Sequence, residues 1–176
     1  RALAKRGILP ETIRQLIVNF GIKPADATVS WENLYSYNRK LLDKKANRYF
    51  FVNDPTTLTV DKIDKPYVSK QPLHPDYPDR GFRTFEIRLS EGKAKFLVSK
   101  DDLPTFNANK FVRLMGLFNI GIKRVAGDAV EAIFHSEPYE EAKKIGAPLV
   151  HWLLTEEGIE TKVILPDLTI KSGLSE

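Results

Sequence analysis

The sequence predicts an α+β fold divided by segments: a small helical subdomain over residues 1–46, then mainly antiparallel β-structure over residues 47–176. Two observations predict this division. Apolar residues recur at helical spacing in the first segment, whereas from Arg48 onward they form ten short runs separated by turn residues. Short strands with few helices between them indicate antiparallel sheets or barrels.

Three short helices are expected in the first segment. One ends at Gly7, and a second starts near Pro10 and ends at Gly21, because proline suits the first turn of a helix and glycine the position after its end. A third begins after Ser30, whose hydroxyl can cap a helix N-terminus.

The β segment is expected to hold strands at residues 48–53, 57–63, 82–89, 93–99, 111–118, 121–125, 129–134, 149–154, 161–165 and 168–171. A tight hairpin turn is expected at Gly127-Asp128. Residues 64–81 hold four prolines and predict a long loop, and residues 136–148 predict an insertion with one helical turn.

Composition excludes several classes of site. The 176 residues include no cysteine, which excludes disulfides, thiol nucleophiles and cysteine zinc sites, and the three histidines are far apart in sequence. No apolar run approaches the roughly 20 residues that a membrane span needs. We therefore expect a cytoplasmic protein without a membrane segment or a histidine metal site. Because the chain starts inside a helical pattern and stops at "SGLSE" without a closing strand, we expect a fragment of a longer protein.

The net charge of +4 is unevenly distributed. Residues 1–46 hold nine Lys/Arg against four Asp/Glu, whereas residues 47–176 hold 18 against 19. A basic helical segment is what a polyanion-binding face requires, although solvated surface lysines produce the same count. Charge alone leaves both interpretations open.

Catalytic patterns are missing. The sequence has no phosphate-binding glycine loop of the G-x-x-x-x-G-K-[ST] or G-x-G-x-x-G kind and no G-x-S-x-G. Adjacent carboxylates occur at Asp101-Asp102, Glu140-Glu141 and Glu156-Glu157. Neighbours on a strand point to opposite faces, and those in loops are usually solvated. His151 lies in an apolar run and is expected to be a hydrogen-bonded core residue. We expect this segment to have no catalytic residues of its own.

Arg113 is the most informative single residue, because it lies in the middle of an apolar strand. A buried arginine must be paired, and Glu86 or Glu131 could serve as its carboxylate partner. The alternative is a binding role, in which Arg113 joins a basic groove with Arg48, Lys100, Lys110, Lys123 and Arg124 beside exposed aromatic rings. Planar donors and stacking rings together bind unstacked bases.

These segments together resemble a known family. "RALAKRGILPETIRQLIVNFGIK", "WENLYSYNRKLLD" and "ANRYFFVNDP", followed in order by "HPDYPDRGFR", "FVRLMGLFNI", "LVHWLL" and "LTIKSGLSE", resemble the glutamyl-tRNA synthetases of the archaeal type. The related glutaminyl-tRNA synthetases share the pattern more loosely. The resemblance covers essentially the whole chain.

The resemblance implies the tRNA-recognition part of a class I glutamate–tRNA ligase. It implies a helical subdomain at residues 1–46 and two β-barrels that bind the anticodon, a proximal one at about 47–75 and 147–176 and a distal one at about 76–146. No cofactor is expected in this segment, since ATP and Mg²⁺ belong to a catalytic domain that would lie before residue 1. The implied partner is tRNA-Glu, with tRNA-Gln left open, and the implied protein is a monomer that could contact other translation proteins.

The resemblance also implies roles for single residues. Arg48 and Arg113 match two anticodon-reading arginines, and Lys110 is the one clearly basic residue where the relatives have a basic pair. Lys123 and Arg124, from the basic groove inferred above, are expected to add to the anticodon site. The tRNA backbone is expected to meet Tyr37, Arg39, Lys40 and Lys44. Two alternatives remain, a freestanding RNA-binding barrel module or a domain whose basic helices bind an acidic protein, besides the same portion of a glutaminyl-tRNA synthetase.

Overall fold

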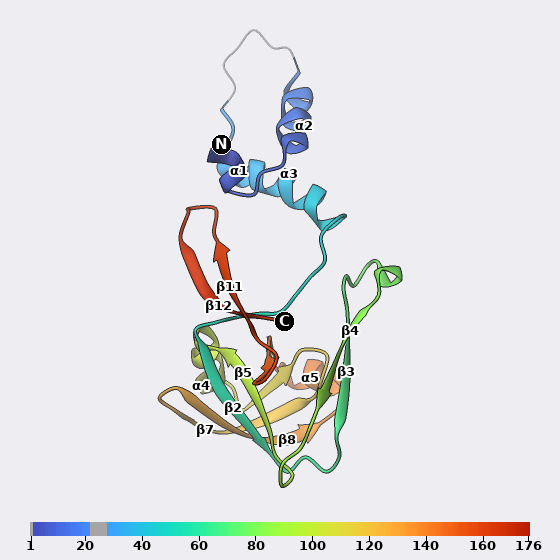
Figure 1. Ribbon diagram of the computed structural model, residues 1–176, viewed down its shortest axis with the longest axis vertical. Helices are drawn as coiled ribbons and strands as arrows, with labels where there is room; N and C mark the ends of the chain where they lie inside the picture. Colours follow the sequence, from blue (N-terminus) through green and yellow to red (C-terminus); the bar gives the residue numbers. More distant parts are fainter. Residues whose placement is uncertain (1, 22–27) are drawn as a thin grey trace. The chain divides into compact units, whose positions relative to one another are not determined.

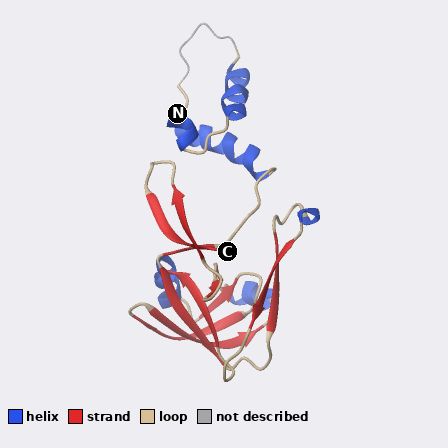
Figure 2. Cartoon of the chain, viewed as in Figure 1, coloured by secondary structure: helices blue, strands red, loops and turns tan. Residues whose placement is uncertain are grey.

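The computed structural model describes residues 2–21 and 28–176, with helices and strands as drawn in Figures 1 and 2. Two compact units arise: Arg1–Asn47 with Val163–Ile170, and Arg48–Lys162 with Lys171–Glu176. The helices are α1 (Ala2–Lys5), α2 (Pro10–Phe20), α3 (Trp31–Asp43), α4 (Leu103–Ala108) and α5 (Tyr139–Ile145), with short 3-10 turns η1 (Pro78–Arg80) and η2 (Lys100–Asp102).

The strands are β1 (Phe51–Asn53), β2 (Pro55–Asp61), β3 (Tyr67–Pro72), β4 (Phe82–Ile87), β5 (Ala94–Ser99), β6 (Phe111–Leu114), β7 (Asn119–Ala126), β8 (Ala129–Ser136), β9 (Leu149–Val150), β10 (Leu153–Leu154), β11 (Ile159–Ile164) and β12 (Ile170–Ser175). Within the described residues, no helix has both the length and the apolar character that crossing a membrane requires.

The three expected N-terminal helices are confirmed, and their ends follow local chemistry. The hydroxyl of Ser30 accepts a hydrogen bond from the backbone N–H of Asn33 at 3.2 Å and so caps α3. Pro10 lies in the first turn of α2, and Gly21 closes that helix with φ 64°.

Asn38 joins the α1–α2 connection to α3. Its Oδ1 accepts hydrogen bonds from the Thr12 hydroxyl at 2.8 Å and the Leu9 N–H at 2.9 Å, and its Nδ2 donates to the Gly7 carbonyl oxygen at 2.9 Å. Asn38 is 7% exposed, beside a small apolar core made of Ile8, Leu16 and Leu34. This buried amide thus holds α2 and α3 in one arrangement.

The second unit is built on a seven-stranded sheet of order β10-β5-β2-β8-β7-β6-β9. Its pairings are antiparallel except β2 with β8 and β6 with β9, and the sheet curls as in Figure 1. A three-stranded sheet β1-β12-β11 and a hairpin β3-β4 are separate. The α+β class with a helical N-terminal part and mostly antiparallel sheets is confirmed, but the two barrels are not: the structure has one curled half-barrel.

The strand pairing does not follow the expected proximal and distal ranges. Strands β2 and β10 lie in the range assigned to the proximal barrel, yet both pair with β5, which lies in the distal range. One continuous sheet therefore draws strands from both ranges.

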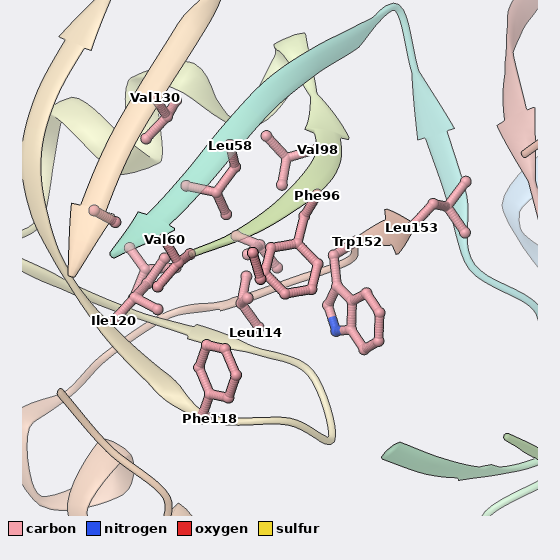
Figure 3. Packing of buried hydrophobic residues seen from close by; sticks show 14 of the residues in the cluster. Leu58, Val60, Phe96, Val98, Leu114, Phe118, Ile120, Val130, Trp152 and Leu153 are labelled. Atoms are coloured by element: carbon pink, nitrogen blue, oxygen red, sulfur yellow. The ribbon is translucent and has the colours of Figure 1, made fainter. Parts of the chain in front are cut away.

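Aliphatic and aromatic side chains together fill the inside of the curled sheet, as Figure 3 shows. Phe96, Phe118 and Trp152 are fully buried, and the rings of Phe96 and Trp152 meet edge to face with centroids 5.3 Å apart. The Trp152 indole N–H donates to the Met115 carbonyl oxygen at 2.9 Å, so its polar atom is satisfied in the core.

The expected loop at residues 64–81 contains strand β3, and this prediction was wrong. The buried positions of β3 are polar, Ser69 and Gln71, so the alternation of apolar residues that predicts a strand is missing. Their side chains bond each other at 2.7 Å, and Ser69 Oγ donates to the Gly116 carbonyl oxygen at 3.0 Å.

The apolar run at residues 149–154 forms two strands rather than one. Strand β9 pairs in parallel with β6, and β10 pairs antiparallel with β5, so the chain changes partner between them. The hairpin at Gly127-Asp128 is confirmed, with Ala126 opposite Ala129. Helix α4, which buries Phe106, was not expected, whereas the helical turn expected in residues 136–148 is confirmed as α5.

Candidate nucleic-acid interface

Arg113 lies on β6 with 7% of its surface exposed. Its Nη1 donates to Oδ1 of Asn119 at 2.8 Å and to the Glu137 carbonyl oxygen at 3.0 Å, and its Nη2 donates to the Leu117 carbonyl oxygen at 3.5 Å. Most of the guanidinium is therefore engaged with the protein itself.

The expected carboxylate partners of Arg113 were wrong, since neither Glu86 nor Glu131 bonds to it. Neutral oxygen atoms take their place. Burial lowers the pKa of the Arg113 guanidinium below its usual range, and the carboxylate of Glu140 opposes this effect. Arginine stays protonated in proteins, so a positive charge lies just beneath the surface here.

The ring of Tyr139 covers this charge. The guanidinium carbon of Arg113 lies 5.4 Å from the ring centroid, which is a cation–π distance. Tyr139 is the first residue of α5 and is 50% exposed. The arrangement is an exposed ring supported from beneath by a buried guanidinium.

Hydrogen bonds fix the chain just before Tyr139. Nδ2 of Asn119 donates to Ser136 Oγ and to the Pro138 carbonyl oxygen, both at 2.9 Å. The Glu137 carboxylate accepts from the Tyr67 hydroxyl at 2.7 Å and pairs with Lys65 Nζ at 2.8 Å. The segment that enters α5 is thus tied to the sheet on both sides.

Strand β9 continues this surface. Leu149 lies opposite Arg113 in the strand pairing and is 46% exposed. His151, two residues further on, is also exposed, whereas Val150 and Trp152 between and beyond them are buried. Exposed and buried residues thus alternate from Leu149 to Trp152. The expectation of a hydrogen-bonded core histidine was wrong.

His151 contacts a residue close to Arg48 in the sequence. Its imidazole stacks on the Phe50 ring with centroids 4.8 Å apart. The guanidinium of Arg83 lies 5.3 Å from the Phe50 centroid and 5.4 Å from that of Tyr49, which is 52% exposed. The Glu176 carboxylate pairs with Arg83 and accepts from the Phe50 N–H.

Arg48 immediately precedes this group. Its backbone N–H donates to the Leu73 carbonyl oxygen at 2.7 Å, which fixes the chain three residues before β1, and its side chain is exposed. We use the name aromatic–arginine stripe for two groups of residues that the chain joins between Leu149 and His151. One group is Arg48, Tyr49, Phe50, Arg83 and His151, and the other is Leu149, Arg113 and Tyr139.

Lys110 directly precedes β6, the strand that holds Arg113. Its Nζ is 5.5 Å from the centroid of the Phe111 ring, and that ring contacts His135 with centroids 4.5 Å apart. Nε2 of His135 lies 3.2 Å from the Glu141 carboxylate on α5. Lys110 lies just before β6 and three residues from Arg113, an odd spacing at which side chains along a strand point to opposite faces. The structure therefore does not place these two basic side chains on one face.

Lys123 and Arg124 lie elsewhere on β7. They are four and five residues beyond Asn119, the partner of Arg113, which corresponds to about 13 and 17 Å along a strand. Lys123 pairs with Asp61 at 3.5 Å, and Arg124 lies opposite Glu131. These two basic residues do not join Arg113 in one groove.

The four residues expected to contact the tRNA backbone lie along α3 and at its end. Arg39, Lys40 and Lys44 are exposed, and Lys40 Nζ lies 5.8 Å from the centroid of the Tyr37 ring. Asn38 between them faces α2, and the Tyr37 ring is half-buried and packs against the small core, whereas Lys40 is exposed.

The β half-barrel also has an open cleft of about 860 Å³. Strand β4, the β4–β5 turn and the residues after β10 line it, with both acidic and basic side chains. None of the nine candidate residues belongs to its lining, which sets the cleft apart from the stripe.

Sequence reasoning missed Tyr49, Arg83 and Tyr139. A usable signal was present, because Tyr49 follows Arg48 directly and Tyr139 follows Glu137-Pro138 at a helix start. What the sequence lacks is the pairing of each ring with an arginine distant in the chain.

Comparison with known proteins identifies the family. The family model described as "tRNA synthetases class I (E and Q), anti-codon binding domain" matches residues 46–137, which are 92 of the 176 residues. The matched range holds most of the half-barrel, together with Arg48 and Arg113.

Curated relatives match over the entire chain. The glutamate–tRNA ligase of Pyrococcus furiosus is 48% identical over 179 residues, which cover 100% of this chain and 30% of the relative. Those of Methanocaldococcus jannaschii and Methanopyrus kandleri are 40% and 38% identical, again over 100% of this chain and over 30% and 31% of the relatives. The chain thus spans about a third of the length of these proteins. It belongs to the family of anticodon-binding domains of the class I tRNA synthetases for glutamate and glutamine.

Proposed function

We propose that the chain is the anticodon-binding part of a glutamate–tRNA ligase, which joins glutamate to tRNA-Glu in the cytoplasm at the expense of ATP. The observation that carries the proposal is the similarity of the whole chain to archaeal glutamate–tRNA ligases, at 38–48% identity. ATP and Mg²⁺ would bind in the catalytic part of the parent enzyme. The β1-β12-β11 sheet would belong to a second barrel, as the resemblance implies.

Arg48 is the proposed direct reader of an anticodon base. It is exposed beside Tyr49, and its backbone is held by Leu73, so its side chain starts from a fixed point. A guanidinium fork can donate two parallel hydrogen bonds to a base edge or a phosphate. Lys110, Lys123 and Arg124 are proposed phosphate contacts of the β unit, and Arg113 takes part from beneath the surface.

The helical unit is proposed to bind the sugar-phosphate backbone through Tyr37, Arg39, Lys40 and Lys44. Such contacts add affinity without sequence information, and they weaken as salt rises because counterions are released. The two units would then supply different parts of tRNA binding, specificity from the β unit and non-specific affinity from α3.

Filter binding with tRNA-Glu and with an anticodon-substituted tRNA-Glu tests this division. Arg48→Ala should cost about 1–3 kcal/mol on tRNA-Glu and remove the preference for the correct anticodon. Lys40→Ala should weaken both tRNAs alike and lower the slope of log K against log salt by about one. Arg88→Ala is the matched control, since its side chain is 85% exposed and outside the stripe.

The outcomes also separate the alternatives. Equal loss on both tRNAs for Arg48→Ala would assign Arg48 to phosphate contact. Binding of any RNA with no anticodon preference would favour a general RNA-binding module, and equal preference for tRNA-Gln would extend the substrate range. No binding of tRNA even at low salt would contradict the proposal.

A further inference from the structure

Tyr139 is placed as a binding residue rather than as a packing residue. Half of its surface is exposed, although a guanidinium lies 5.4 Å from its ring centroid and is itself only 7% exposed. Burying a charge is costly unless it is well paired. Arg113 meets this condition through its hydrogen bonds and the ring, so the inner face of Tyr139 is used by the protein and its outer face is open to a ligand.

Arg113 has little capacity to bind a ligand itself. Asn119 and the carbonyl oxygens of Glu137 and Leu117 accept hydrogen bonds from both terminal nitrogens of its guanidinium. A base edge would have to displace these protein contacts to be read by Arg113. The face of the Tyr139 ring needs no such displacement.

The ring is also held in place before any ligand arrives. Asn119 bonds the Pro138 carbonyl oxygen, Arg113 bonds the Glu137 carbonyl oxygen, and α5 begins at Tyr139 itself. A group fixed in its binding conformation loses less entropy when it binds. A fixed, exposed aromatic ring is what stacking on an unpaired base requires, because every base has a π-face.

The surroundings favour a base over a phosphate at this point. Glu140 and Glu141 follow Tyr139 directly, and their negative charge repels a phosphate close to the ring. Exposed Lys143 lies one turn along α5, at i+4 from Tyr139, where it can reach the backbone of the same nucleotide strand. Leu149, exposed and opposite Arg113, offers apolar contact beside the ring.

We propose that Tyr139 stacks on an unpaired base of the tRNA anticodon loop, and that Arg113 is a positioning residue that holds the Tyr139 ring. This inference rests on the proposed function, since it needs a tRNA with splayed loop bases as the ligand. It changes the expected role of Arg113 from a direct base contact to a support beneath the surface.

The test uses the whole chain and anticodon stem-loop RNAs of tRNA-Glu in which each loop base in turn is removed to leave an abasic site. Tyr139→Leu should weaken binding of the intact stem-loop by about 5- to 140-fold, because stacking contributes roughly 1–3 kcal/mol per base. Tyr139→Phe should stay within about 2-fold, since it keeps the π-face. On one abasic RNA, Tyr139→Leu should cause no further loss.

Ile145→Ala is the control for general apolar contact. Ile145 lies on the same helix and is 42% exposed, but it is six residues from Tyr139 and so faces another direction. Its substitution should leave binding unchanged. An equal loss for Ile145→Ala and Tyr139→Leu would show a broad apolar contact, such as a protein partner makes, and would overturn the inference.

A double substitution with Tyr139→Leu tests the role of Arg113. Arg113→Gln should weaken binding of the intact stem-loop. The double variant Arg113→Gln, Tyr139→Leu should bind no more weakly than Tyr139→Leu alone. Both variants that carry Arg113→Gln are also expected to have a lower melting temperature. A purely structural role would make the two effects on binding additive.

Failure of the inference and failure of the proposed function look different. If Tyr139→Leu binds like the unchanged protein, or loses the same factor on every abasic RNA, the stacking role is overturned while anticodon preference persists. If the unchanged protein does not bind the stem-loop or the tRNA at all, the proposed function fails and the inference fails with it.

Discussion

Gly116, after β6, shows how one residue can depend on a single distant side chain. Its φ is 64°, in the left-handed region that favours glycine. A Cβ built on Gly116 would lie 1.8 Å from Nε2 of Gln71. Gln71 cannot easily move, because it is 6% exposed and bonded to Ser69 Oγ at 2.7 Å and to the Met115 carbonyl oxygen at 3.3 Å.

We therefore expect Gly116→Ala to destabilise the protein more than another glycine with the same backbone. Left-handed backbone costs an L-residue roughly 1–2 kcal/mol, and the displacement of Gln71 adds about 1–3 kcal/mol. Gly127→Ala is the matched control, since φ is 55° there and no atom lies within 4 Å of the added Cβ. Urea unfolding measures both, and equal losses would contradict the role of Gln71.

At the scale of elements, the junction of β8 and α5 depends on one carboxylate. Hydrogen bonds from Lys65 and Tyr67 hold the pKa of the Glu137 carboxyl below its usual range. Because the pKa is lower in the folded state than in the unfolded chain, the ionised form favours folding. The junction positions Tyr139, so its stability bears directly on the proposed stacking site.

The direction of this pKa shift determines the pH range over which the Glu137 carboxylate stabilises the fold. The stabilisation from Glu137 should be complete above its ordinary pKa near 4.5 and should be lost as the pH falls below that value. The free energy of unfolding of the unchanged protein should thus exceed that of Glu137→Gln at pH 7, and the two should converge in acid. Glu160→Gln, an exposed site on β11, is the control. A gap between the curves that does not change with pH would contradict this account.

At the scale of the whole molecule, the two units have separate hydrophobic cores. The helical unit packs around Ile8, Leu16 and Leu34, whereas the β unit packs around a much larger cluster that includes Phe96 and Trp152. Among residues 2–21 and 28–176, none belongs to both clusters. Each unit should unfold cooperatively with its own core, so the unit with the small core should unfold at a lower denaturant concentration than the unit with the large core.

The Trp31→Phe variant makes this measurable. Trp31 is 49% exposed in the helical unit, so its loss should be tolerated, and Trp152 then reports the β unit alone by fluorescence. Circular dichroism at the helical band follows mainly α2 and α3. We expect the helical signal to be lost at a lower urea concentration than the fluorescence signal. Coincident transitions would show instead that the chain unfolds as one cooperative body.

The features that the sequence by itself determined are local ones. Helices α2 and α3 and the Gly127-Asp128 hairpin follow from proline, glycine, capping serine and apolar spacing within a few residues. The resemblance of whole segments also identified the family, because several motifs in the same order are specific to a family, whereas a single residue is not. Arg48 could be singled out in the same way, at the boundary between helical and β patterns.

Tertiary structure alone decided the partners of Arg113 and the form of the β unit. Glu137 is 24 residues from Arg113, and only the β7–β8 hairpin brings its carbonyl oxygen to 3.0 Å from the guanidinium. Backbone carbonyl groups are the same at every residue, so no side-chain pattern in the sequence marks them as partners. For the same reason Tyr139 is an ordinary tyrosine in the sequence, and becomes a candidate base-binding ring only where the fold sets it over a buried charge.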